Sequence, residues 1–415
     1  MSIAPAIRAR TARLAAVAAL ASWTLLPLPA AASTAGQGRI YGTIETESGN
    51  KYTGLLRWGG EEAFWDDHFN ASKEDRPALD ARDRRSRHRN RDVEVFGIRI
   101  SGDWSDDWAQ RQFIARFGDL SEIRPQRHSE ADLVMRNGET IHVEGGSNDL
   151  EDDVTVWDEK LGKLDVAWSK IRSIKFTSAP ASLTPAERRL YGKVKTTSGE
   201  FEGFVQWDSE ECLSTDKLDG ETEDGDISIE MGNIRSIERR SRRGSWVSLV
   251  DGRRIDVSGT NDVDDDIRGI LVEDPRYGRV KISWDAFERV DFVPTDKSGR
   301  GYDEYPPGKP IVATVTDAHG KTRRGEIAYD LDETGSWELL DGSSDDIDYS
   351  IPFEKVKSVR PLGGRAAEVV LRDGSKLRLE GETDVSDDNG GIGFLKGAAA
   401  GDYVAWEDVE RIDFD

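Results

Sequence analysis

The chain has 415 residues, of which 80 are acidic and 57 are lysine or arginine, so that its formal net charge is −23. This acidic excess argues against general nucleic-acid binding, because phosphate groups would be repelled. The single cysteine excludes an intramolecular disulfide framework and any zinc or iron–sulfur site that needs several cysteines.

Residues 1–32 have the three-part pattern of a secretory signal peptide. Arg8, Arg10 and Arg13 precede an apolar stretch at 14–28, and three alanines at 30–32 supply the small residues of a cleavage site. The apolar stretch is short for a membrane-spanning helix, although an uncleaved N-terminal anchor is the alternative. We therefore expect cleavage after Ala32 and a periplasmic or secreted protein with no transmembrane segment in the mature chain.

The remaining sequence contains one pattern three times. Trp168, Trp284 and Trp406 each begin a closing segment with apolar residues three, six and eight positions later. An Asn-Gly or Asp-Gly pair precedes each closing segment, and residues 58–62, 207–211 and 329–333 match without gaps. These matches predict three repeats, at 38–176, 190–293 and 310–415. Residues 177–189 and 294–309 have the composition of linkers.

Each predicted repeat divides into two halves, since the same apolar spacing also occurs near its middle. The first apolar residues of these middle segments are Phe117, Met231 and Phe353. Alternating apolar residues on both sides of Asp251-Gly252 are typical of a β-hairpin, and few windows have helical periodicity. The sequence therefore predicts an all-β protein.

A spacing of three cannot keep apolar residues on one face of a strand. A short helical turn between two strands would return both residues to the interior, and would place the three closing tryptophans in a core. This pattern resembles the SH3-like and Sm-like small β-barrels, and the resemblance implies two closed barrels in each repeat. The RNA binding of Sm proteins is not implied by these residues. A six-bladed β-propeller is the alternative architecture.

The first repeat contains a charged insertion at about 66–112 that the other two lack. Arginines in it could bind an anionic polymer such as lipopolysaccharide phosphate, or they could form a solvated loop beside the acidic surface. Tryptophans in this region, including Trp65, have no repeat counterparts and are the better aromatic candidates for ligand contact. The candidate ligand-binding residues are Arg84, Arg85, Arg87, Arg89, Trp104 and Trp108.

An acidic turn follows the second hairpin of each repeat. Clustered aspartates in a turn can bind Ca²⁺, but Asp and Asn side chains also stabilise turns by binding backbone amides. The candidate Ca²⁺ ligands are Asp149, Asp152 and Asp153, then Asp262, Asp265 and Asp266, and finally Asp384, Asp387 and Asp388. Residues 330–335 with Asp341 approach the spacing of an EF-hand, and we interpret them as a turn of the repeat.

The sequence contains no HExxH motif, no Gly-x-Ser-x-Gly motif and no phosphate-binding glycine loop. We therefore predict a non-catalytic exported protein that binds an envelope partner, either a protein or a polysaccharide, or acts as an envelope scaffold, without a cofactor. Two alternatives remain open. One is a hydrolase that acts on envelope polysaccharide or peptidoglycan through acidic residues. The other is a structural repeat protein stabilised by Ca²⁺.

Overall fold

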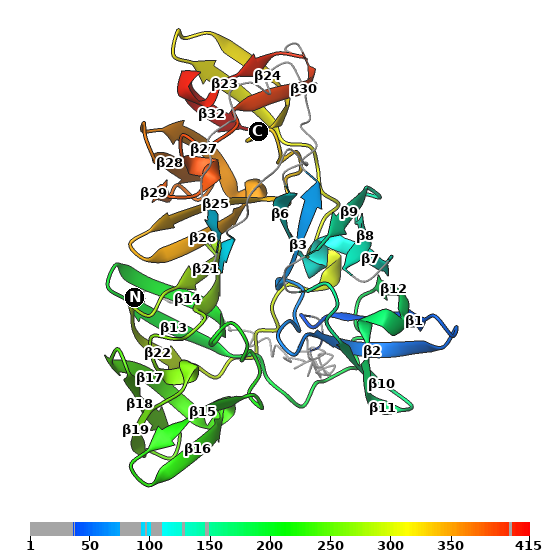
Figure 1. Ribbon diagram of the computed structural model, residues 1–415, viewed down its shortest axis with the longest axis vertical. Coiled ribbons are helices and arrows are strands. Elements are labelled where there is room, and N and C mark those ends of the chain that lie inside the picture. The colour runs from blue at the N-terminus through cyan, green and yellow to red at the C-terminus, as the bar shows by residue number, and fades with distance from the viewer. Residues whose placement is uncertain are drawn as a thin grey trace, which may run out of the picture. The chain divides into compact units, whose positions relative to one another are not determined.

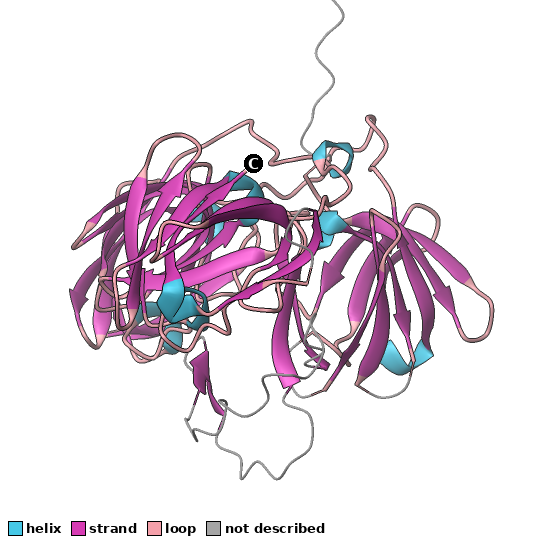
Figure 2. Ribbon diagram, turned by 90° about the horizontal axis from the view of Figure 1, so that it is seen from above, coloured by secondary structure: helices cyan, strands magenta, loops and turns pink. Residues whose placement is uncertain are grey.

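The computed structural model describes residues 36, 38–74, 93–95, 98–100, 110–126, 129–145, 149–397 and 401–415. The predicted signal peptide and the candidate ligand-binding residues Arg84, Arg85, Arg87, Arg89, Trp104 and Trp108 lie outside this range. The described part is all-β, and its helical segments are eight 3-10 turns of three residues each (Figure 2). None of these helices is long and apolar enough to cross a membrane.

The strands fall into three segments of the chain. The first segment contains β1 (Tyr41–Thr46), β2 (Lys51–Trp58), β3 (His68–Glu74), β4 (Val93–Val95), β5 (Ile98–Ile100), β6 (Gln110–Arg116), η1 (Phe117–Asp119), β7 (Leu120–Pro125), β8 (Glu130–Met135), β9 (Thr140–Glu144), β10 (Val154–Asp158), β11 (Gly162–Val166), η2 (Trp168–Lys170) and β12 (Ile171–Phe176). The second contains β13 (Tyr191–Thr196), β14 (Gly199–Gln206), β15 (Lys217–Thr222), β16 (Gly225–Glu230), η3 (Met231–Asn233), β17 (Ile234–Ser241), β18 (Gly244–Leu249), β19 (Arg254–Ser258), η4 (Asn261–Val263), β20 (Ile270–Asp274), β21 (Gly278–Ile282) and β22 (Phe287–Phe292). After η5 (Tyr302–Glu304), the third contains β23 (Val312–Asp317), β24 (Thr322–Ala328), β25 (Leu339–Ser344), β26 (Ile347–Pro352), η6 (Phe353–Lys355), β27 (Val356–Pro361), β28 (Ala366–Leu371), β29 (Lys376–Glu380), η7 (Thr383–Val385), β30 (Ile392–Gly397), β31 (Tyr403–Val404), η8 (Trp406–Asp408) and β32 (Val409–Phe414).

The antiparallel pairings follow one order in all three segments. In the first segment the order is β11-β10-β2-β1-β12-β7-β8-β9-β3-β6. In the second it is β21-β20-β14-β13-β22-β17-β18-β19-β15-β16. In the third it is β31-β30-β24-β23-β32-β27-β28-β29-β25-β26. Strands β21 and β26 pair with each other, so the second and third segments share one sheet (Figure 1).

These pairings correct the expected architecture. Each path is open, because its two end strands do not pair with each other among the described residues, so the closed barrels expected from the sequence are not formed. The strands also form two large sheets of ten and twenty strands rather than the separate blades of a propeller.

The two sequence halves of the second segment exchange strands. Strands β13 and β14, from the first half, pair with β22 and β20 of the second half (Figure 1). Conversely, β15 and β17 of the first half pair with β19 and β18 of the second half. Strands β17 and β18 are neighbours in the chain, whereas β15 and β19 are not. Because the halves have similar apolar patterns, a strand pair from one half can complete the sheet of the other. The same exchange occurs in the first and third segments.

The tight turns predicted from the apolar spacing are confirmed. Turns η1, η2, η3, η6 and η8 each lie directly before a strand and begin with a buried apolar residue. The closing residues Trp168, Trp284 and Trp406 are 5%, 3% and 3% exposed, as expected for core residues. Gly252, in the predicted hairpin turn between β18 and β19, has a φ of +94°, which favours glycine.

The expected linker at 294–309 contributes to the core of the first segment. Tyr302 and Tyr305 are buried there, and the Tyr302 ring lies 4.5 Å from that of Trp65. Trp65 is fully buried, so the suggestion that it contacts a ligand is wrong. A Cβ atom on Gly118 would lie 2.6 Å from the Tyr305 ring, which explains the need for glycine at this contact.

The insertion in the first segment has narrower bounds than the expected 66–112. Strands β3 and β6 pair over seven positions, from His68 with Arg116 to Glu74 with Gln110. They correspond to β15 and β16 in the common strand order, so both belong to the shared fold. The additional residues therefore lie between Glu74 and Gln110.

Buried and partly buried ion pairs connect the first and second segments. The carboxylate of Asp67 lies 3.0 Å from Arg279 and 3.6 Å from Arg189. Arg57 makes two hydrogen bonds to the carboxylate of Asp216, at 2.8 and 3.0 Å. Arg279 and Arg189 also pair with Glu273 and Asp66, so these buried charges share several partners across the two segments.

Candidate metal centre

Three acidic side chains form the candidate metal centre of the second segment, and a tight turn at residues 207–211 supplies two of them, Asp208 and Glu211. The backbone amide of Trp207 donates to the carbonyl of Glu211 at 2.8 Å, and the amide of Glu211 donates back to Trp207 at 2.9 Å. Between them, Asp208 and Ser209 have φ values of +50° and +58°, where L-residues are strained. The same turn in the first segment has glycines at these two positions, Gly59 and Gly60. The second segment therefore has an aspartate, a residue type that adopts this conformation more readily than most, at a position where the first segment has glycine.

The acidic turn at 259–266 supplies the third side chain. Asp262 lies in η4, and its carbonyl accepts a hydrogen bond from the indole Nε1 of Trp207 at 2.8 Å. Its Oδ2 accepts a hydrogen bond from the backbone amide of Asp219 at 2.7 Å. Together these bonds hold the acidic turn against the turn that carries Asp208 and Glu211.

Both hydrogen bonds recur in the other two segments. The carbonyl of Asp384 accepts from the hydroxyl of Tyr329 at 2.7 Å, and its Oδ2 accepts from the amide of Asp341 at 2.7 Å. The carbonyl of Asp149 accepts from the indole of Trp58 at 2.7 Å, and its carboxylate accepts from the amide of Asn70. The first aspartate of every acidic turn is therefore part of the fold.

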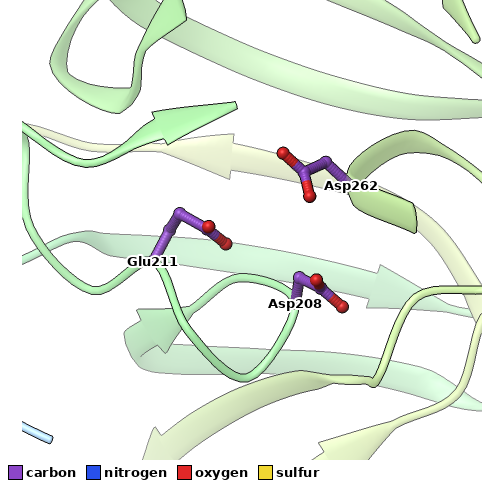
Figure 3. A group of neighbouring side chains, drawn as sticks. All are labelled: Asp208, Glu211 and Asp262. Carbon is purple, nitrogen blue, oxygen red and sulfur yellow. The ribbon is translucent and has the colours of Figure 1, made fainter. Parts of the chain in front are cut away.

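These bonds bring three carboxyl groups together. Asp208 and Glu211 project from the same turn, and Asp262 faces them from η4 (Figure 3). Candidate ligand atoms of the three lie within 4.8 Å of one another, and the residues are 0%, 8% and 7% exposed. We call this group the second-segment triad. Asp330, Glu333 and Asp384 form the matching third-segment triad under the same 4.8 Å limit.

Two carboxyl groups of the second-segment triad, those of Glu211 and Asp262, resist ionisation. Burial and the neighbouring carboxylates raise the pKa of Glu211 to about 9. Burial also raises the pKa of Asp262 to about 6, and the hydrogen bond from the Asp219 amide partly opposes this shift. Arg268 provides a countercharge on one side, with its Nη2 2.7 Å from Oδ2 of Asp208.

The third-segment triad has a different set of neighbours. The backbone amide of Gly390 donates a hydrogen bond to Asp330. Gly390 occupies the position in its acidic turn that Arg268 occupies in the second segment. Burial, followed by the Asp384 carboxylate, raises the pKa of Glu333 well above the usual range. Burial, followed by the carboxylates of Asp341 and Asp330, does the same for Asp384. Lys73 pairs at 3.0 Å with Asp332, which adjoins Glu333 in the sequence.

The first segment has two of the three acidic residues. Glu62 and Asp149 occupy the matching positions and are 7% and 3% exposed, but Gly59 stands where the other segments have aspartate. A Cβ atom on Gly59 would lie 2.7 Å from Oδ2 of Asp152, so the Asp152 carboxylate fills the space. Burial raises the pKa of Glu62 well above its usual range and that of Asp149 to about 7.

The three predicted Ca²⁺ ligands of each acidic turn differ in burial. Within each acidic turn only the first aspartate (Asp149, Asp262 or Asp384) is buried. Asp152 and Asp265 are half-buried, and Asp265 pairs with Arg242 at 2.6 Å. The exposed members are Asp153, Asp266, Asp387 and Asp388. Among the described residues, each group of close carboxylates therefore combines one aspartate of an acidic turn with two residues of the tight turn at 207–211 or 329–333.

Sequence reasoning missed Asp208, Glu211 and Glu333 as site residues, and treated Asp330 as part of a turn. The signal was present in the gapless match between 207–211 and 329–333, where an aspartate and a glutamate recur three positions apart. That spacing alone does not predict a metal site, because the third carboxylate comes from the acidic turn, which is distant in the sequence. Comparisons with models of protein families, with curated proteins and with solved structures gave no match.

Proposed function

We propose that this is a non-catalytic exported protein, built from three β repeats, that binds an envelope partner or acts as an envelope scaffold. Each repeat would consist of two SH3-like units that exchange strands. The observation that carries this proposal is the ten-strand pairing order, which occurs in the same form in all three segments. Arrays of one structural unit offer extended surfaces for binding, and their neighbouring units stabilise each other.

The contacts between segments support a scaffold role. Strand β21 pairs with β26 across four positions, including Lys281 with Asp348. Asp67 of the first segment meets Arg279 of the second at 3.0 Å. A protein that positions partners benefits from such fixed geometry. The export signal at residues 1–32 supports a periplasmic or secreted location, with an envelope protein or polysaccharide as the partner and no role for nucleic acid.

A hydrolase acting on envelope polysaccharide or peptidoglycan is the second candidate function. The observation in its favour is the pair Glu211 and Asp262, because neighbouring carboxyl groups with different raised pKa values can serve as acid and base. Their burial weighs against it, since the two residues are 8% and 7% exposed and a polymer would have to reach them.

Co-sedimentation and turnover assays test both functions. The purified mature protein is incubated with peptidoglycan, with lipopolysaccharide and with envelope polysaccharide. We expect retention on at least one of these, or crosslinking to a defined envelope protein, without release of soluble fragments. Release of fragments that stops in the Asp262→Asn variant would favour the hydrolase. Absence of both retention and crosslinking would refute the binding function.

A further inference from the structure

We propose that the second-segment triad and the third-segment triad each bind a divalent cation of the Ca²⁺ type. The ligands in the second segment would be Asp208, Glu211 and Asp262. Those in the third would be Asp330, Glu333 and Asp384. These sites concern the stability of the chain and do not depend on which envelope partner it binds.

The geometry supports a common ligand for each triad. The three carboxyl groups of a triad come from two turns that are far apart in sequence, yet their ligand atoms lie within 4.8 Å of one another. Oxygen atoms at such separations can bind one ion at the Ca²⁺–oxygen distance of about 2.4 Å. Figure 3 shows Glu211 and Asp262 facing each other from opposite sides, with Asp208 beside them.

An unpartnered oxygen in each triad points to a missing ligand. Oε2 of Glu211 is buried and has no hydrogen-bond partner, and the whole residue is 8% exposed. Oε2 of Glu333, at the matching position, is also buried without a partner. Buried polar atoms in proteins nearly always have partners, so an atom left unsatisfied is a candidate for contact with an ion or water. The same unsatisfied atom occurs in Glu62 of the first segment, so it indicates a cation site only where two further carboxyl groups lie within the 4.8 Å limit.

The charge balance also favours a cation. Asp208 already has Arg268 at 2.7 Å, whereas the remaining two carboxyl groups of that triad face each other. In the third segment, the charged groups that act most on Glu333 are carboxylates, namely Asp384, Asp332 and Asp330. Several buried carboxyl groups must either retain protons or share a counterion. A bound cation would supply a countercharge to them.

The type of ligand defines the type of metal. All three side chains of each triad offer carboxylate oxygens, which favour hard cations over the softer metals that prefer sulfur or imidazole. Ca²⁺ takes six to eight oxygens in flexible geometry, and it accepts bidentate carboxylates more readily than Mg²⁺ does. Three carboxylates with water could meet this requirement.

The first segment provides an internal control. Its matching glutamate, Glu62, also has a buried Oε2 without a partner. Gly59 replaces the aspartate, however, and among the described residues no first-segment group of three meets the 4.8 Å limit. The variant Glu62→Gln should therefore leave cation binding unchanged. Glu211→Gln and Glu333→Gln preserve side-chain volume and remove one ligand charge from each triad.

The test uses the full mature chain after dialysis against a chelator. Calorimetric titration with CaCl₂ should give about two ions per chain, and thermal unfolding should shift to higher temperature as Ca²⁺ rises, as mass action requires. Glu211→Gln and Glu333→Gln should each remove one binding event, and the double variant should remove both. Glu62→Gln should titrate like the wild type.

A second measurement keeps the proposal testable if a variant folds poorly. Tb³⁺ bound to the wild-type protein should show emission sensitised by Trp207, whose indole donates a hydrogen bond to the carbonyl of Asp262. Added Ca²⁺ should displace the Tb³⁺ and reduce this emission. The proposal is overturned if neither Ca²⁺ binding nor a thermal shift occurs in the wild type. It is equally overturned if the double variant binds Ca²⁺ as the wild type does. Retention on peptidoglycan or lipopolysaccharide is a separate readout, so its loss would not affect this conclusion.

Discussion

Replacing Glu211 by glutamine should change how stability depends on pH in metal-free protein. The pKa of Glu211 is raised by burial from 4.5 to about 9, so the native state keeps a proton that the unfolded state releases between these values. Unfolding then releases a proton, and stability falls as pH rises. One proton corresponds to about 1.4 kcal/mol per pH unit, or at most about 4 kcal/mol between about pH 5 and pH 8. Glutamine resembles the protonated acid and cannot ionise, so the variant should lose this dependence.

Urea unfolding in the presence of chelator, followed by tryptophan fluorescence, measures the effect. The free energy of unfolding of Glu211→Gln should fall less steeply with pH than that of the wild type, by about one proton. Glu200→Gln, on an exposed position of β14, is the matched control and should retain the wild-type slope. Equal slopes for wild type and Glu211→Gln would refute the reasoning, because they would mean that Glu211 ionises as readily in the native state as in the unfolded chain.

Three further predictions concern packing and buried charge. Gly118→Ala should lower the free energy of unfolding by about 1–3 kcal/mol, because the new Cβ would lie 2.6 Å from the Tyr305 ring. Tyr305→Leu in the same chain should make the alanine less costly, and additive effects in the double-mutant cycle would contradict the contact. Asp67→Asn should cost about 1–3 kcal/mol in chemical denaturation, since it removes the carboxylate 3.0 Å from Arg279, which keeps Glu273 as its other partner; no measurable loss would argue against that pair. Cys212, which is buried and whose thiol pKa is raised by burial, should react with a maleimide only after denaturation, and rapid labelling of native protein would count against its placement.

Much of the local structure could be predicted because it depends on neighbouring residues. The Asp251-Gly252 pair specified a hairpin, since glycine accepts the positive φ of a tight turn. The spacing of apolar residues after Trp284 and Trp406 specified a turn before the final strand. The burial of both tryptophans follows from the same pattern. Each of these predictions needed a window of only a few residues.

The pairing partners could not be predicted in the same way. The two halves of a segment have similar apolar patterns, so the sequence does not show whether β13 and β14 complete their own half or the other one. The lengths of the connecting loops do not decide between these pairings, because the entropic cost of closing a loop rises slowly with its length. The tertiary structure exchanges the strands, which leaves the paths open where closed barrels had been expected.

The candidate site illustrates the same division. The sequence by itself determined that an acidic turn recurs three times, that its aspartates are suited to backbone hydrogen bonds or to Ca²⁺, and that Asp208 and Glu211 recur as Asp330 and Glu333. Only the tertiary structure decided which of these groups meet, because the hydrogen bond from Trp207 to the carbonyl of Asp262 joins positions 55 residues apart. Burial and the electrostatics of close carboxyl groups depend on such distant contacts, and no local pattern encodes them.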